Sequence, residues 1–276
     1  MRHVTKAPKE PDIRATLEAA RYSLAPNVKG LMKLDLLVHA ADYESTCFVA
    51  GIMTQEARRL QTLRLRYSLP GSALNVLGNI AEVPTPRKRP IPVQNLHALE
   101  LEMINLHDRR FSLSSSGSYS LMAWLDLVHL KSLELLFCCN AVRFLSDLAN
   151  LYSQNKAPPL ETFKMKLLTE DSGAGASQGM LNAVENVLDV SNGLRELLVY
   201  SSKLRLICST CVTFHGPTLQ SLKVHNRDHD TYSLADILFI SKQCPALRQL
   251  ALDLPKVPVL INDTGDKLWT LELDVQ

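Results

Sequence analysis

The 276-residue sequence lacks any long apolar run. No stretch approaches the roughly 18 consecutive apolar residues that a membrane-spanning helix requires. The first fourteen residues are polar and include Lys6, Pro8, Lys9, Pro11 and Asp12, so they lack the apolar centre of a secretory signal. We therefore expect an intracellular protein, in the cytoplasm, the nucleus or both, with no membrane partner.

An excess of charge of one sign is also missing. The sequence has 30 Lys and Arg residues and 28 Asp and Glu residues, which leaves a formal net charge of +2. Bulk charge therefore predicts neither a nucleic-acid partner nor a membrane surface. The six cysteines are scattered and lack the regular spacing of a disulfide framework. We therefore expect them to be small, buried apolar side chains in a reducing compartment and not to form disulfides. Their positions are 47, 138, 139, 208, 211 and 244.

Motifs of common enzyme classes are absent. The serine-rich stretch 112–120 contains no nucleophile elbow. The run Gly173-Ala174-Gly175 lacks both the dinucleotide-binding glycine pattern and a phosphate-binding lysine, and we expect a loop there. The sequence predicts a non-enzymatic protein without a cofactor.

The sequence does contain a hexad, Leu-x-x-Leu-x-Leu with conservative replacements, that recurs nine times. Self-similarity at this period is typical of a solenoid, in which each unit stacks its apolar edge on its neighbour. We expect one elongated repeat domain over residues 29–276, preceded by a leader and helical cap at 1–28. The nine copies begin at Leu31, Leu60, Leu96, Leu130, Leu160, Leu194, Leu219, Leu247 and Leu268.

Each repeat combines two periodicities. The fourth and sixth hexad positions alternate with polar neighbours, which predicts a short strand with one buried face. Helical spacing follows in several connections, so we expect an α/β horseshoe with a parallel concave sheet and a mostly helical convex side. The connections 200–218 and 253–267 predict extended or single-turn returns. The segments with helical spacing are 43–59, 72–82, 119–128, 141–154, 178–190 and 232–243.

The hexads resemble leucine-rich repeats, and their long, irregular spacing resembles the class found in F-box proteins, notably fungal ones. The segment 244–250, Cys-Pro-Ala-Leu-Arg-Gln-Leu, closely matches that class, in which a helix ends in Cys-Pro before the next strand. Most copies lack the asparagine or cysteine that usually follows the last leucine of a unit. The resemblance implies a protein-binding scaffold like the substrate-recognition half of an F-box-type ubiquitin-ligase receptor. Since the leader lacks the Leu-Pro-x-Glu type opening, a ubiquitin-ligase adaptor is expected only if an F-box lies outside this chain.

A second spacing competes with the repeats in one region. Cys208, Cys211, His225 and His229 follow a Cys-x2-Cys-x13-His-x3-His pattern that suits a tetrahedral zinc ion. This pattern predicts, as the alternative, a zinc-dependent nucleic-acid-binding module around residues 208–229. The hexad that begins at Leu219 occupies the same segment, which cannot be both a strand and the helix of a zinc finger. We therefore favour the repeat and assign no metal ligand.

A basic, proline-rich insertion occupies residues 83–93. Four prolines there bracket Arg87, Lys88 and Arg89 and exclude a helix. The sequence predicts a solvated loop, with a nuclear-import signal or a site for an acidic partner as the alternative.

The outward-facing positions of the strands form the candidate binding site. If hexad positions four and six face the core, position five and the flanking position seven face the concave surface. We expect an acidic patch at Glu100, Glu102 and Glu134 between basic groups, and a protein partner that presents basic groups between acidic ones. Leucines and a tyrosine in these rows are either interface anchors or covered by loops. The candidate residues are Arg64, Arg66, Glu100, Glu102, Glu134, Leu136, Lys164, Lys166, Leu198, Tyr200, Lys223 and His225.

Overall fold

Strands and helices alternate along the described part of the chain. The computed structural model describes residues 31–38, 59–67, 95–104, 106, 125, 127–138, 141–154, 160–167, 174–201, 206–226 and 231–253. The strands are β1 (Lys33–Val38), β2 (Thr62–Tyr67), β3 (Ala98–Glu102), β4 (Ser132–Leu136), β5 (Thr162–Lys166), β6 (Glu196–Ser201), β7 (Ser221–Asn226) and β8 (Gln249–Leu252). The helices are the 3-10 helix η3 (Leu127–His129) and the α-helices α4 (Val142–Gln154), α5 (Ala174–Val190), α6 (Ser209–Phe214) and α7 (Leu234–Gln243).

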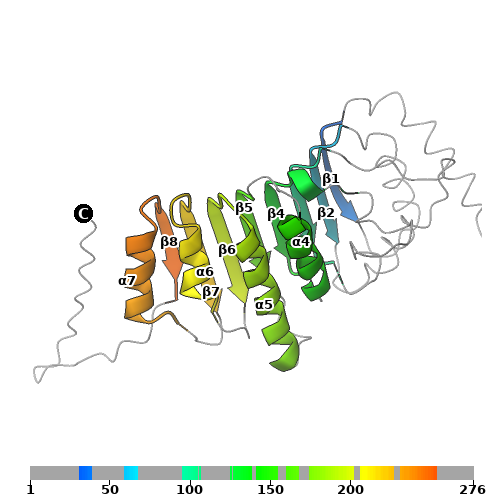
Figure 1. Cartoon of the computed structure of the whole chain (residues 1–276). Helices are drawn as coiled ribbons and strands as arrows, with labels where there is room; N and C mark the ends of the chain where they lie inside the picture. The colour runs from blue at the N-terminus through cyan, green and yellow to red at the C-terminus, as the bar shows by residue number, and fades with distance from the viewer. Residues whose placement is uncertain are drawn as a thin grey trace, which may run out of the picture.

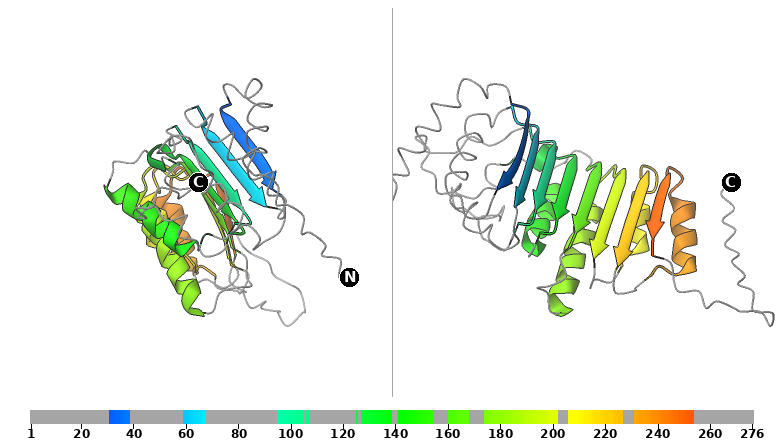
Figure 2. Two further views of the ribbon diagram at one scale, coloured as in Figure 1. Left: turned by 90° about the vertical axis from the view of Figure 1, so that its right-hand side faces the viewer. Right: turned by 180° about the vertical axis from the view of Figure 1, so that it is seen from behind.

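The eight strands form one open, all-parallel sheet in sequence order, from β1 to β8 (Figure 1). The α-helices lie against one face of this sheet, and the view from behind, at the right of Figure 2, shows the strands in front of them. Parallel neighbours need a crossover connection, and the helices provide it on one side. The predicted α/β architecture with a parallel sheet is therefore confirmed, and the first eight hexads supply its eight strands.

Hexad positions four and six form the core, as predicted. In β3, β4 and β5 buried and partly exposed residues alternate strictly, which reflects the two-residue period of a strand. The side chains at these positions belong to one hydrophobic cluster that also contains buried residues of the helices. The fully buried members include Leu63, Leu65, Leu99, Leu101, Leu133, Leu135, Phe163, Met165, Leu197 and Leu222.

The chain enters every strand after the first in the same way. The backbone N–H groups of hexad positions two and three both donate to the carbonyl oxygen of position two in the preceding repeat. At β2, Gln61 and Thr62 donate to Met32 O at 2.8 and 3.0 Å. This repeated turn geometry keeps the register constant along the sheet. The accepting carbonyls belong to Met32, Gln61, His97, Lys131, Glu161, Arg195 and Gln220.

Two predicted helices agree with the structure to within two residues. α4 coincides with the predicted segment 141–154 apart from its first residue, and it buries one stripe of side chains that includes Phe144, Leu148 and Tyr152. α7 lies within the predicted segment 232–243 and begins with a capping box. In this box the Ser233 hydroxyl accepts a hydrogen bond from the Asp236 N–H at 3.1 Å, and the Asp236 carboxylate accepts one from the Ser233 N–H at 3.2 Å. Local chemistry therefore determines where α7 starts.

Two other connections differ from the prediction. α5 begins at Ala174 instead of residue 178, so the predicted loop at 173–175 is wrong from Ala174 onward. Packing of α5 against α4 outweighs the weak helix propensity of glycine. A short helix, α6, occupies part of the connection predicted as an extended or single-turn return. Its six residues contain a single buried side chain, Val212, so they show no helical periodicity in the sequence.

Burial decreases at β8. Leu250, at hexad position four, is 45% exposed, whereas the equivalent leucines in the central strands are fully buried. β8 is the last strand in the described part of the chain and has a strand neighbour on one side only. Since a position-four side chain packs between neighbouring repeats, an end strand lacks half of that contact.

Several predictions fall outside the described residues. These are the leader and cap at 1–28, the basic loop at 83–93, the ninth hexad from Leu268, and the helical segments 43–58 and 72–82. Among the helices that the structure describes, none combines the length and the apolar character needed to cross a membrane.

Candidate functional site

The candidate residues lie on the open face of the sheet, opposite the described helices, in two rows. The strands pair without a shift in register, so the same hexad position recurs at the same height in each neighbouring strand. All the predicted binding residues therefore share one surface. The row at position five contains Asp35, Arg64, Glu100, Glu134, Lys164, Leu198, Lys223 and Ala251. The row at position seven contains Leu37, Arg66, Glu102, Leu136, Lys166, Tyr200 and His225.

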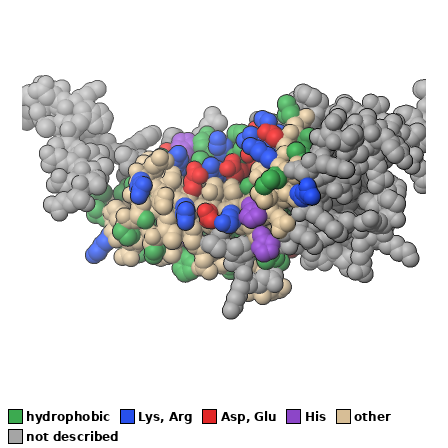
Figure 3. Space-filling model, turned by 90° about the horizontal axis from the view of Figure 1, so that it is seen from above, with side chains coloured by type: hydrophobic (Ala, Val, Ile, Leu, Met, Phe, Trp, Pro, Cys, Tyr) green, Lys and Arg blue, Asp and Glu red, His purple; other side chains and the backbone are tan. Residues whose placement is uncertain are grey.

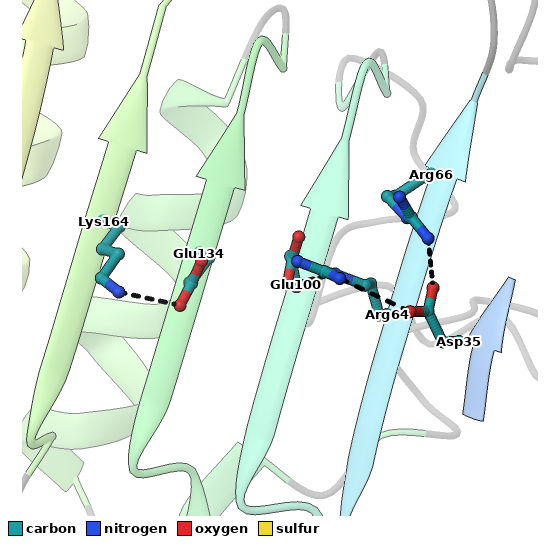
Figure 4. A network of polar contacts seen from close by, with 6 residues as sticks. All are labelled: Asp35, Arg64, Arg66, Glu100, Glu134 and Lys164. Atoms are coloured by element: carbon teal, nitrogen blue, oxygen red, sulfur yellow. Dashed lines mark hydrogen bonds and ion pairs between the residues drawn. The ribbon is translucent and has the colours of Figure 1, made fainter. Parts of the chain in front are cut away.

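An ion-pair network joins the first three strands of the open face (Figure 4). Arg64 on β2 lies between two carboxylates, with its Nε paired with Glu100 Oε2 and its Nη1 3.4 Å from Asp35 Oδ2. Arg66 Nη2 reaches the other oxygen of Asp35 at 3.0 Å. Parallel pairing in register places these opposite charges side by side on adjacent strands.

The network favours the charged forms of its members. The hydrogen bond with Glu100 raises the pKa of Arg64; partial desolvation opposes this shift, and Asp35 adds to it. Partial desolvation acts to raise the pKa of Asp35, but hydrogen bonds with Arg66 and Arg64, together with their charges, lower it overall. Both groups therefore remain charged at neutral pH.

A second group of ion pairs surrounds Lys164 on β5. Lys164 Nζ lies 3.3 Å from Glu134 Oε1 on β4 and 3.1 Å from Glu196 Oε2 on β6. Partial desolvation acts to lower the pKa of Lys164, but the hydrogen bond with Glu196 and the charges of both glutamates raise it overall. Glu196 was not among the predicted site residues. Its place at hexad position three, which also faces outward, is the signal that would have identified it.

The expected acidic patch is largely neutralised within the face. Of its three members, Glu100 pairs with Arg64 and Glu134 pairs with Lys164. A space-filling view shows basic and acidic side chains interleaved along the sheet rather than gathered by sign (Figure 3). Among the described residues, three charged members of the rows form no ion pair. They are Glu102, Lys166 and Lys223.

A stacked aromatic pair occupies the row at position seven near β7. The Tyr200 and His225 rings stack, with centroids 4.7 Å apart and planes 28° apart. His225 Nδ1 lies 2.6 Å from Asp253 Oδ1, and Asp253 Oδ2 accepts from the Asn226 N–H at 2.6 Å. A carboxylate only accepts, so Nδ1 carries the proton and the imidazole orientation is fixed. Asp253, just after β8, therefore positions the ring.

The apolar residues of the open face differ in exposure. Leu136, Leu198 and Tyr200 are partly buried. Their exposure is intermediate between that expected of exposed interface anchors and that expected of side chains covered by loops. Leu37 on β1 is 53% exposed, although it was not among the predicted site residues. Leu136, Leu198 and Tyr200 have a neighbouring strand on each side, whose side chains shield them. Leu37 is more exposed because β1 is the first strand in the described part of the chain and has a strand neighbour on one side only.

The structure places the described residues of the Cys-x2-Cys-x13-His-x3-His pattern on two different faces of the sheet. Cys208 precedes α6 and Cys211 lies within it, and α6 packs on the helix-covered face of the sheet (Figure 1). His225 belongs to the outward-facing row at position seven of the opposite face. His229 lies outside the described residues. Within the described ranges, no three or more His, Cys, Asp or Glu side chains form a group that could hold a metal ion. The two cysteines and His225 therefore do not converge on one site.

Comparison with known proteins found no family model and no curated protein that match this chain.

Proposed function

We propose that this chain is a leucine-rich-repeat solenoid that binds another protein on its open face and has no catalytic role of its own. The identical strand entry at seven successive strand pairs supports the solenoid, because a stacked repeat reproduces one turn geometry in each unit. Cys138 adds support. It occupies the ninth position of its repeat, where leucine-rich repeats place asparagine or cysteine, and its thiol donates to Leu101 O of the preceding repeat at 3.2 Å.

One observation carries the binding proposal: the composition of the open face between β4 and β7. Leu136, Leu198 and Tyr200 lie there beside Lys166 and Lys223, which form no ion pair among the described residues. Aromatic and apolar anchors within a polar surround are typical of the centre of protein interfaces. A parallel sheet also presents a broad, regular surface, which suits a protein better than a small molecule.

The charges favour an acidic protein segment with an apolar side chain as the ligand. Lys166 and Lys223 are available to pair with it, and electrostatic complementarity would orient it across the strands. The sequence-based expectation of a partner that presents basic groups between acidic ones depended on three carboxylates without ion pairs. Glu100 and Glu134 already have partners on neighbouring strands, so a basic ligand would have to compete with Arg64 and Lys164.

The resemblance to F-box receptors provides one specific form of this proposal. In that form the open face holds the substrate of a ubiquitin ligase, and an F-box segment outside this chain supplies the contact with the adaptor. The binding proposal does not depend on this link, because it concerns only the open face.

Affinity capture with quantitative mass spectrometry tests the proposal. We would compare the wild type with a triple variant, Lys166→Ala, Tyr200→Ala and Lys223→Ala, at two salt concentrations. We expect at least one protein that the wild type retains and the variant loses, with retention that weakens as salt rises because paired charges are screened.

A matched control places equivalent changes on the opposite side of the molecule. Arg143→Ala, Phe214→Ala and Lys242→Ala remove two cations and one aromatic ring from exposed helical positions. Circular dichroism and urea midpoints would establish that both triple variants fold. If both variants retain the same proteins as the wild type, the open face is not the binding surface.

A further inference from the structure

Cys208 and Cys211 are not explained by the proposed function. Cys208 immediately precedes α6, and Cys211 is the third residue of that helix. The backbone of Cys208 is extended, with φ −59° and ψ 131°, before the chain turns into the helix. The Cys208 side chain folds back over the first turn of the helix, where its Sγ contacts the Thr210 hydroxyl. Both cysteines also have partners on α5, because the Cys208 N–H donates to Glu185 and the Cys211 thiol forms a hydrogen bond with Asp189.

The two cysteines differ in exposure from the other described cysteines. Cys208 and Cys211 are partly exposed, whereas Cys138 and Cys244 are buried. Hydrogen bonds hold the backbone and the thiol of the first cysteine in place. The Cys208 N–H donates to Glu185 Oε1 on α5 at 2.9 Å, and the Cys208 Sγ lies 2.9 Å from the Thr210 Oγ1.

We propose that Cys208 and Cys211 form a reversible dithiol–disulfide site that exchanges with small-molecule disulfides of the glutathione disulfide type. The site lies on the helix-covered side of the sheet, so this inference is independent of binding at the open face. A Cys-x-x-Cys pair at the start of a helix has the spacing used for thiol–disulfide exchange, and a dithiol needs no third ligand.

The surroundings give the two thiols different roles. The hydrogen bond with the Thr210 hydroxyl, and then that with its backbone N–H, lowers the pKa of Cys208. Burial, followed by the charge of Asp189 and a hydrogen bond with it, raises the pKa of Cys211 to about 12. Since the thiolate is the nucleophile, Cys208 is the attacking group and Cys211 is the resolving group.

The exchange balances in two steps. The Cys208 thiolate attacks one sulfur of glutathione disulfide, forms a mixed disulfide and releases one glutathione thiolate, which takes up the proton that Cys208 lost. Cys211 then loses its proton to water and attacks the Cys208 sulfur. This second attack releases the other glutathione thiolate, which receives that proton. The protein dithiol is oxidised to a disulfide, and glutathione disulfide is reduced to two glutathione molecules.

Redox titration of the full chain in glutathione buffers tests the site. Tryptic peptides after acid quenching and alkylation are read by mass spectrometry, and both cysteines fall in one peptide, residues 206–223. We expect the wild-type peptide to lose two hydrogens in oxidising buffer and to recover them when reduced glutathione is added. The Cys211→Ser variant should stop at a mixed glutathione disulfide on Cys208. The Cys208→Ser variant should react roughly tenfold more slowly.

Two further variants separate this chemistry from general thiol exposure. Thr210→Val removes the hydroxyl beside Cys208 and should slow the first step at neutral pH, while Cys244→Ser, at a buried cysteine, should leave both steps unchanged. Accumulation of the mixed disulfide in the wild type to the level seen in Cys211→Ser would overturn the proposal. Equal rates for Cys208→Ser and the wild type would overturn it as well.

Discussion

The two faces of the sheet are built from the same hexads but are held together by different interactions. On the helix-covered face, side chains such as Leu99 and Phe163 are removed from water, and apolar burial contributes about 25 cal/mol per Å². On the open face, residues such as Arg64 and Lys164 form ion pairs while still partly exposed, and such pairs contribute about 0–1 kcal/mol each. Most of the stability therefore belongs to the first face, which leaves the second free to vary.

The open face itself differs from end to end. At β1 to β3 the charges of Asp35, Arg64 and Glu100 are engaged with one another. Toward β7, Tyr200 and His225 stack beside Lys223, which has no ion pair among the described residues. Under the proposed function, a ligand at the first end would compete with existing ion pairs, whereas a ligand at the second end would not have to displace an ion pair from Lys223.

The largest expected effect comes from the core of β5. Phe163→Ala removes a fully buried ring, and we expect a loss of about 3–5 kcal/mol in the free energy of unfolding, because the cavity cannot be refilled. The neighbouring Lys164→Ala, on the opposite face, should cost no more than about 1 kcal/mol. Urea denaturation followed by circular dichroism measures both. Equal losses would contradict the division of roles between the faces.

The second largest loss of stability is expected where the backbone at Gly216 approaches the end of α7. A Cβ added at Gly216 would lie 2.0 Å from the Gln243 carbonyl oxygen at the end of α7. We expect Gly216→Ala to shift this helix and to cost about 1–3 kcal/mol in unfolding free energy. Gly179→Ala on α5 is the control, since nothing lies within 4 Å of a Cβ added there. If the two alanine variants have the same urea midpoint, the approach is less tight than the structure indicates.

Acid should weaken the helix-covered side at His215. Burial lowers the pKa of His215, partly offset by its hydrogen bond to Leu188 O at 3.1 Å and by the charge of Asp189. The unfolded chain therefore takes up a proton at a higher pH than the folded chain does. Stability is fully present above the ordinary histidine pKa of about 6.5 and falls as the pH drops from there toward the lowered folded value.

Urea midpoints between pH 7.5 and pH 5 would measure this effect. His215→Gln retains an amide donor for Leu188 O but does not titrate, so the wild-type midpoint should fall more steeply than that of the variant. Parallel pH profiles would show that His215 is not the responsible group.

The smallest effect is expected in the network of the open face. Arg64→Ala should reduce the unfolding free energy by about 0.2–1 kcal/mol, because its ion pairs are partly exposed. A double-mutant cycle with Glu100→Ala isolates the pair, and its coupling should decrease as salt is added. A coupling of several kcal/mol that is insensitive to salt would mean that this face also contributes a core-like share of stability.

Much of the fold was accessible from sequence because the hexad links periodicity to burial. Alternation around Leu133 and Leu135 predicted a strand with one buried face, and equal hexad positions predicted the register. The start of α5 and the existence of α6 were not predicted. A helix of six residues with one buried side chain leaves no periodic pattern, and a glycine-rich helix start depends on packing partners that are distant in sequence.

The candidate site divides in the same way. Sequence alone was sufficient to place Arg64, Glu100, Glu134 and Lys164 on one face, because that placement follows from the two-residue period of a strand and the repeat. Only the tertiary structure decided that these charges neutralise one another, and that Cys208 and His225 lie on opposite sides of the sheet. Periodicity is a local property of the backbone, whereas pairing depends on which strands become neighbours and where each side chain ends in space.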